Sequence, residues 1–103
     1  MNEDQIYLNI SELLSSVAPA DVVAVKMSAE LSPETSSCKL EYDAVRPDGS
    51  EFWLVGGGDV NSKMLDLLVD LRRIYLDRNS DWRKCVAELD VAKGKMKFNF
   101  LYS

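Results

Sequence analysis

The last third of the chain contains a hairpin pattern that constrains the fold more than any other feature. Trp82 opens a strand-like run that ends at Leu89, and a Lys-Gly-Lys turn follows at residues 93–95. Residues 96–102 then alternate, with large apolar side chains at every second position. A period of two places successive side chains on opposite faces of a β-sheet. The pattern therefore predicts a closing hairpin with its aromatic side chains turned to the core.

Two other segments have the spacing of an amphipathic helix. The first, residues 3–17, is predicted to be capped by Asn2 and to end before Pro19. The second is predicted from about residue 59 to residue 78, with Asp59 or Ser62 as its N-cap. The apolar stripes are Ile6, Ile10, Leu13, Leu14 and Val17 in the first helix, and Val60, Met64, Leu67, Leu68, Leu71 and Tyr75 in the second.

Three strands are predicted between these helices. Residues 22–31 and 38–44 alternate with a period of two, and a turn at residues 32–36 separates them. A second turn, Arg-Pro-Asp-Gly-Ser, occupies residues 46–50, because proline fixes φ and glycine accepts positive φ. Residues 51–55 are apolar on both faces, so we expect either a helix on each side or one exposed, partner-binding face. The inward residues of the first two strands are Val23, Val25, Met27, Ala29, Leu31, Cys38, Leu40, Tyr42 and Ala44.

The order of these elements, α-β-β-β-α-β-β, predicts the fold class. At 103 residues the chain is expected to form one domain over residues 1–103, because a second core would be too small to stand alone. Hairpin-linked strands between two helices imply an antiparallel five-stranded sheet in an α+β domain. Since the strands are amphipathic, we expect both helices on one face of the sheet.

The absence of histidine removes most common catalytic and metal-binding arrangements. It excludes Ser–His and Cys–His nucleophile pairs and takes away the commonest general base. Cys38 and Cys85 alone cannot complete a four-ligand zinc site, and their strand positions beside apolar neighbours predict small buried side chains. We therefore expect no enzymatic activity and no cofactor or metal.

Other patterns argue against membranes, phosphates and nucleic acids as ligands. No apolar run approaches the ~18–20 residues that span a bilayer, and the first ten residues lack a basic signal-peptide start, so we expect a cytoplasmic protein. The glycines at residues 56–58 precede a helix but fit no phosphate-binding fingerprint, and Asp59 would repel a phosphate there. The lysines of the closing hairpin lie opposite its aromatic side chains, so direct nucleic-acid binding is not expected.

The charge is divided unevenly along the chain. Residues 1–70 hold 13 of the 17 acidic and 4 of the 12 basic residues, whereas residues 71–103 are basic. An acidic portion of this size suits a basic protein partner, because opposite charges speed encounter. Its exposed faces supply the predicted partner-binding residues, with one tryptophan as the apolar anchor. These residues are Glu41, Asp43, Trp53, Asp59, Asp66 and Asp70.

Landmarks along nearly the whole chain resemble those of the YezG-type immunity proteins, which are small acidic proteins encoded beside secreted polymorphic toxins. Trp82 precedes a strand leading to residues 94–102, GKMKFNFLY, which is similar to the family's closing G-K-F-x-x-x-x-Y pattern. Before that tryptophan the chain has Asp81, where the family usually has proline. The earlier landmarks are Ile6-Tyr7 and Pro19 of the first helix, Ala29-Glu30-Leu31 and Tyr42 on the strands, and the leucine-rich second helix.

This resemblance implies an antitoxin that binds one toxin domain, often a basic nuclease, and blocks or distorts its active site. Acidic side chains could then mimic the charge of the nuclease substrate, and the protein would be a monomer or weak homodimer. One alternative is a small acidic adaptor or secretion chaperone, which would usually dimerise and bind an unfolded segment. Another is a hydrolase that uses two carboxylates converging in a cleft.

Overall fold

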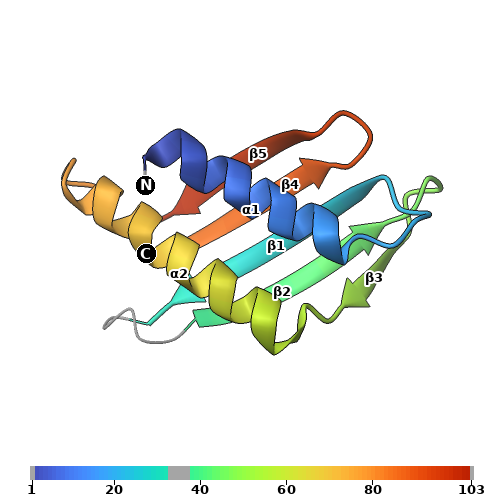
Figure 1. The fold of residues 1–103 in the computed structure, drawn as a ribbon, viewed down its shortest axis with the longest axis horizontal. Helices are drawn as coiled ribbons and strands as arrows, with labels where there is room; N and C mark the ends of the chain where they lie inside the picture. The colour runs from blue at the N-terminus through green and yellow to red at the C-terminus, as the bar shows by residue number, and fades with distance from the viewer. Residues whose placement is uncertain (1, 33–37, 103) are drawn as a thin grey trace.

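The computed structural model describes residues 2–32 and 38–102 and has the predicted α+β architecture, with element order α-β-β-β-α-β-β. The strands form one antiparallel sheet in the order β3-β2-β1-β4-β5, so the first strand in sequence is the central one (Figure 1). The elements are α1 (Glu3–Val17), β1 (Ala24–Leu31), β2 (Cys38–Val45), β3 (Glu51–Leu54), α2 (Gly57–Leu76), β4 (Lys84–Asp90) and β5 (Lys95–Leu101).

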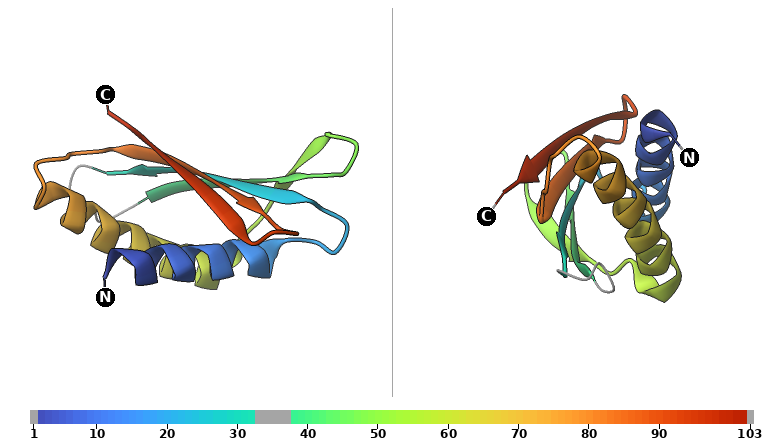
Figure 2. Two further views of the ribbon diagram at one scale, coloured as in Figure 1. Left: turned by 90° about the horizontal axis from the view of Figure 1, so that it is seen from above. Right: turned by 90° about the vertical axis from the view of Figure 1, so that its left-hand side faces the viewer.

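Both helices lie on the same face of the sheet, and none of the described residues forms a helix on the other face (Figure 2). The prediction of a one-sided arrangement is therefore confirmed. Asn2 caps α1 as predicted, because its side-chain oxygen accepts a hydrogen bond from the Gln5 backbone N–H at 2.8 Å. Within residues 2–32 and 38–102, no helix is long and apolar enough to cross a membrane.

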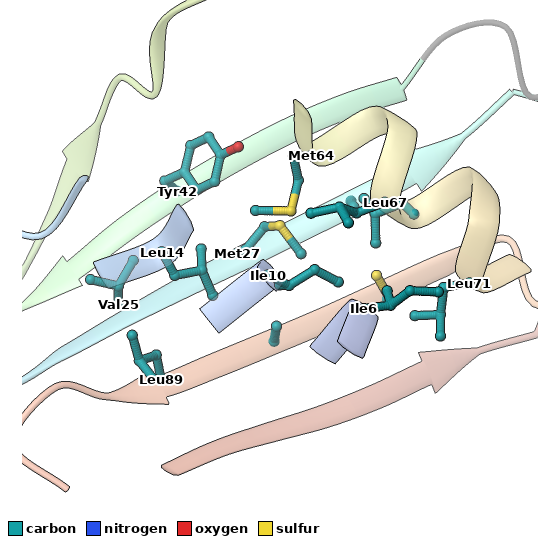
Figure 3. Close-up of a cluster of buried hydrophobic side chains, with 14 of the residues drawn as sticks. Ile6, Ile10, Leu14, Val25, Met27, Tyr42, Met64, Leu67, Leu71 and Leu89 are labelled. Carbon is teal, nitrogen blue, oxygen red and sulfur yellow. The ribbon is translucent and has the colours of Figure 1, made fainter. Parts of the chain in front are cut away.

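The core lies between the two helices and the covered face of the sheet (Figure 3). Helix α1 contributes Ile6, Ile10 and Leu14, which are fully buried at the spacing of one helical stripe. Central strand β1 contributes Val25 and Met27, which are also fully buried. Burying these side chains provides the main favourable free energy of folding, at about 1.5–3 kcal/mol for each large apolar side chain. Further core residues come from α2 and β4: Met64, Leu68, Leu71, Cys85, Ala87 and Leu89.

Phe98 and Phe100 of the closing hairpin turn to the covered face, as predicted, whereas Tyr102 lies beyond the end of β5 and is 59% exposed. Phe100 contacts Trp82 and Tyr75, with ring centroids 5.1 and 4.6 Å apart. Phe98 lies 5.2 Å from the ring of Tyr7, and the Tyr7 and Tyr75 hydroxyls are hydrogen-bonded at 2.8 Å. This cluster joins β5 to both helices, and Trp82, which contacts Phe100, is fully buried. Its aromatic groups therefore hold the fold together.

Several sequence predictions need correction at the element ends. Strand β1 begins at Ala24, and it is Val22 that is buried, while Val23 is 41% exposed because the chain is still turning there. Helix α2 begins at Gly57 without a side-chain cap, so neither Asp59 nor Ser62 is its N-cap. The glycines allow this early start, since Gly57 has φ of +83°. Most of the predicted turn at residues 32–36 lies outside the described residues.

Candidate partner-binding surface

Trp53 is the most exposed aromatic side chain on the helix-free face of the sheet. Along β3, Phe52 and Leu54 pack against the core, so the alternation directs Trp53 to the opposite face. The side chain is 74% exposed, whereas Trp82 is fully buried. Of the two possibilities left open for this strand, the structure has the exposed face.

Two of the predicted carboxylates lie beside this tryptophan. Asp43 is its direct cross-strand partner on β2, and Glu41 is the next outward residue along the same strand. Glu41, Trp53 and Val55 line a hollow of about 180 Å³ at the end of β3, and Val55 is 89% exposed. We refer to Glu41, Asp43, Trp53 and Val55 as the Trp53 surface.

The two carboxylates of this surface have basic neighbours, and Glu41 lines a small hollow together with Lys39 and Lys84. Lys26 is the cross-strand partner of Asp43, but its ammonium group pairs with Glu51 at 3.2 Å. Within the described part of the chain, neither Glu41 nor Asp43 makes an ion pair. An exposed indole face beside unpaired carboxylates suits a cationic side chain, which both groups attract.

The rest of the helix-free face has nearly balanced charge. Acidic and basic residues alternate across the strands, so that Glu88 lies opposite both Lys26 and Lys97, and Glu30 pairs with Lys84 at 3.5 Å. Opposite charges at such positions stabilise a sheet modestly. Strand β5, at the far edge, presents Lys95 and Lys97. The face as a whole is therefore not acidic, and its excess negative charge is local to β2 and β3.

The other predicted acids lie on the helix side of the molecule. Asp66 and Asp70 line a groove of about 390 Å³ between α1 and α2 together with Glu12, and Leu13 and Leu67 also line it. Asp59 belongs to neither surface, because it is in the first turn of α2. There it pairs with Lys63 at 3.3 Å.

The six predicted residues are thus divided between two sides of the protein. Glu12 was missed, because its position beside Asp66 depends on how the two helices pack and no local pattern in the sequence indicates it.

The end of β3 explains why Trp53 lies at an open edge. A Cβ atom on Gly56 would lie 2.7 Å from Tyr42 Cε2 and 2.9 Å from Asn61 Oδ1, so only glycine fits there. The Tyr42 hydroxyl also donates to Asn61 Oδ1 at 3.0 Å. The chain therefore leaves β3 after Leu54 and passes over the Tyr42 ring into α2. The glycines act as a tight strand-to-helix connection, as the sequence predicts.

The two thiols are poorly suited to nucleophilic chemistry. Burial raises the pKa of Cys38 to about 11 and that of Cys85 to about 12, so both stay protonated near neutral pH. Cys85 is fully buried as predicted, whereas Cys38 is only half-buried. Among residues 2–32 and 38–102, no group of three or more His, Cys, Asp or Glu side chains could hold a metal ion.

Comparison with known proteins adds no further assignment. No protein-family model matches the chain, and no curated protein matches it. The Trp53 surface and the groove between the helices are therefore the two candidate sites, and they differ in chemistry. The first combines carboxylates with an exposed aromatic ring, while the second combines carboxylates with leucine side chains.

Proposed function

We propose that this protein is a cytoplasmic immunity protein that binds a basic toxin domain with nuclease activity. It neutralises the toxin by blocking its active site and carries out no catalysis of its own. The resemblance to the YezG-type proteins supplies the class of partner, and the Trp53 surface supplies a means of binding it. The observation that carries the proposal is an indole ring, 74% exposed, flanked by the unpaired carboxylates of Asp43 and Glu41. Tryptophan is enriched in interface hot spots, and unpaired acidic groups attract the basic surface of a phosphate-binding enzyme.

The helix groove is the weaker candidate for this role. One of its carboxylates already has an ion-pair partner, since Asp70 lies 3.6 Å from the guanidinium of Arg73. It also offers no aromatic anchor, because the apolar residues lining it are Leu13 and Leu67. We therefore place the interface on β2 and β3.

The test uses two double variants that change the net charge equally. Glu41→Lys with Asp43→Lys alters the Trp53 surface, whereas Asp66→Lys with Asp70→Lys alters the groove. Each is coexpressed with the C-terminal domain of the toxin encoded in the neighbouring reading frame. We expect the first to lose protection of the cells and the second to keep it, because long-range attraction is equal in both. The reverse result would place the interface in the groove. Full protection of the cells by both double variants would exclude mimicry of the substrate's charge.

Trp53→Ala provides an independent measure of the same surface. A hot-spot tryptophan contributes at least about 2 kcal/mol, so its removal is expected to weaken toxin binding about 30-fold. Exposed Leu8 on α1 serves as the matched control, because Leu8→Ala also removes an exposed apolar side chain, on the helix side of the molecule.

An adaptor or secretion chaperone is a second candidate, because an exposed ring and Val55 at a sheet edge could equally receive an unfolded segment. The mass of the complex in solution and the state of the bound domain separate the two functions. An immunity protein binds a folded toxin domain, whereas a chaperone, usually as a dimer, binds the same chain only when it is unfolded.

A further inference from the structure

Strand β2 is paired along only half of its length on the side of β3. It has eight residues, whereas β3 has four, and the β2–β3 register runs only from Tyr42↔Leu54 to Val45↔Glu51. Figure 1 shows β3 beside the part of β2 that leads into their connecting turn. Residues 38–41 of β2 therefore have no neighbouring strand on that side within the described residues.

The alternation of backbone hydrogen bonds shows which groups of β2 face this open position. In an antiparallel pair, every second residue directs its N–H and C=O to the same neighbour. The Arg46 N–H donates to the Ser50 C=O at 2.9 Å, which places Ala44 and Tyr42 in the set that faces β3. The same alternation directs the backbone of Leu40 to that side, beyond the point where β3 has ended. Leu40 thus presents a donor and an acceptor where a further strand residue would lie.

The residues around Leu40 form a short binding site for an added strand. Leu40, Glu41, Trp53 and Val55 all line the hollow of about 180 Å³, and the start of α2 limits it through Gly56 and Asn61. The site exists because the chain turns away over Tyr42 at Gly56, where a larger residue would not fit. An unpaired strand edge is a template for another strand.

The two edges of the sheet differ in charge, and this difference selects the occupant. The β2–β3 edge carries three acidic residues, Glu41, Asp43 and Glu51, against one lysine, Lys39, whereas the β5 edge carries Lys95 and Lys97. A basic extended segment is attracted to the first edge and repelled by the second. Lysines on an edge strand also discourage unwanted pairing in general.

We infer that the toxin partner binds by strand addition: a basic extended segment pairs with the backbone at Leu40 and places a cationic side chain between Trp53 and Glu41. This inference rests on the proposed function and specifies how that surface holds its partner. Main-chain hydrogen bonds would supply affinity, and the Trp53 surface would supply selectivity for positive charge.

Amide hydrogen exchange of the wild-type protein tests the inference directly. The reporter is the Leu40 amide, which has no partner among the described residues of the free protein and becomes paired on strand addition. The control is the Phe98 amide: Arg83 N–H donates to Leu101 C=O at 3.3 Å, so the alternation directs Phe98 to the outer edge of β5. The probes are the neighbouring toxin domain, a synthetic decapeptide of alternating arginine and threonine, and its glutamate–threonine counterpart.

We expect saturation with the toxin domain or the basic peptide to slow exchange at Leu40 at least about tenfold, with Phe98 unchanged and the acidic peptide without effect. Unchanged exchange at Leu40 with both the toxin domain and the basic peptide overturns the inference. A toxin domain that binds and is neutralised without protection of Leu40 overturns the inference alone. Protection by the basic peptide with no binding of the toxin domain overturns the proposed function, and leaves Leu40 as a site of strand addition for a basic segment from another partner.

A matched pair of variants separates the backbone hydrogen bond from the side chain. Leu40→Pro removes the N–H at an edge position, where proline is tolerated, and Leu40→Ala keeps the N–H but shortens the side chain. Affinity for the toxin domain is expected to be about tenfold lower for the proline variant than for the alanine variant. Equal affinities of the two folded variants would contradict strand addition at this residue.

Discussion

Single residues decide where β3 stops and what it leaves exposed. Gly56 lies against the ring of Tyr42, and there is no room for a Cβ atom between them. The backbone of Gly56 has φ of −74°, an ordinary value for any residue, so the requirement for glycine is steric rather than conformational. The sequence predicts the glycines to be a tight connection, but it cannot indicate which of them is in contact with an aromatic ring.

The first prediction tests whether position 56 requires glycine for steric reasons. Gly56→Ala is expected to lower the free energy of unfolding by about 1–3 kcal/mol, because the added methyl group would meet Tyr42 at 2.7 Å. Gly58→Ala is the control, since a Cβ there meets nothing within 4 Å and alanine favours the helix by up to about 1 kcal/mol. Urea denaturation measures both. Equal stability of the two variants would contradict the close packing at Gly56.

The thiols provide a second prediction at the residue scale. Since burial raises the pKa of Cys38 from 9.0 to about 11, the reactive thiolate is scarcer at every pH below that value. The rate of its reaction with Ellman's reagent is therefore expected to rise about tenfold per pH unit through pH 9 without levelling off. Cys38→Ala and Cys85→Ala assign the signals, and fully buried Cys85 is expected to react more slowly. A plateau near pH 9 would contradict the raised pKa.

At the scale of elements, one buried cation connects α2 to β4. Arg72 is only 6% exposed, its Nε donates to the Trp82 C=O at 3.2 Å, and its terminal nitrogen pairs with Asp81 at 2.6 Å. These contacts of Arg72 with Asp81 and with the Trp82 carbonyl orient the entry to β4. The period of α2 identifies its apolar stripe, but the burial of Arg72 depends on residues nine and ten positions later in the chain.

Removing this connection is the third prediction. Arg72→Met keeps the apolar length of the side chain but leaves the Trp82 carbonyl without its donor, which is expected to cost about 1–3 kcal/mol in unfolding free energy. The control is Arg83→Met, which removes only a contact of 3.5 Å to the same Asp81 and is expected to cost less than about 1 kcal/mol. Thermal denaturation followed by circular dichroism compares them. Similar losses in both variants would show that Arg72 does not act as a buried anchor.

The accuracy of the element predictions has a physical explanation. Helix α1 was predicted over residues 3–17 and is observed as Glu3–Val17, because its stripe, cap and terminating proline are all local signals. The prediction that Val23 faces the core is wrong, because the turn before β1 changes which valine is buried. Trp53 could be identified as a candidate but not placed, since β3 alone does not reveal which face of the sheet the helices cover.

At the scale of the whole molecule, the net charge and the Trp53 surface act over different distances. The net charge of −5 acts over a distance on any approaching partner, whereas the Trp53 surface is a small contact region at one edge of the sheet. The division of Glu41 and Asp43 from Asp66 and Asp70 follows from topology, because β2 and α2 present their polar residues to opposite sides of the molecule. The acidic composition predicts long-range attraction of a basic partner, but only the fold shows where the Trp53 surface lies.

The last prediction uses binding kinetics with the neighbouring toxin domain to distinguish these contributions. Glu41→Gln with Asp43→Gln is expected to lower the association rate at about 0.05 M salt and to reduce its dependence on salt, because the steering charge is weaker. Trp53→Ala is expected to raise the dissociation rate and to leave the salt dependence unchanged, because it removes contact area and no charge. At about 0.5 M salt, screening shortens the range of the charges to a few Å, so the association rates of all three proteins should converge. A tryptophan variant that changes the salt dependence, or a glutamine variant that alters only dissociation, would show that steering and contact are not separable at this surface.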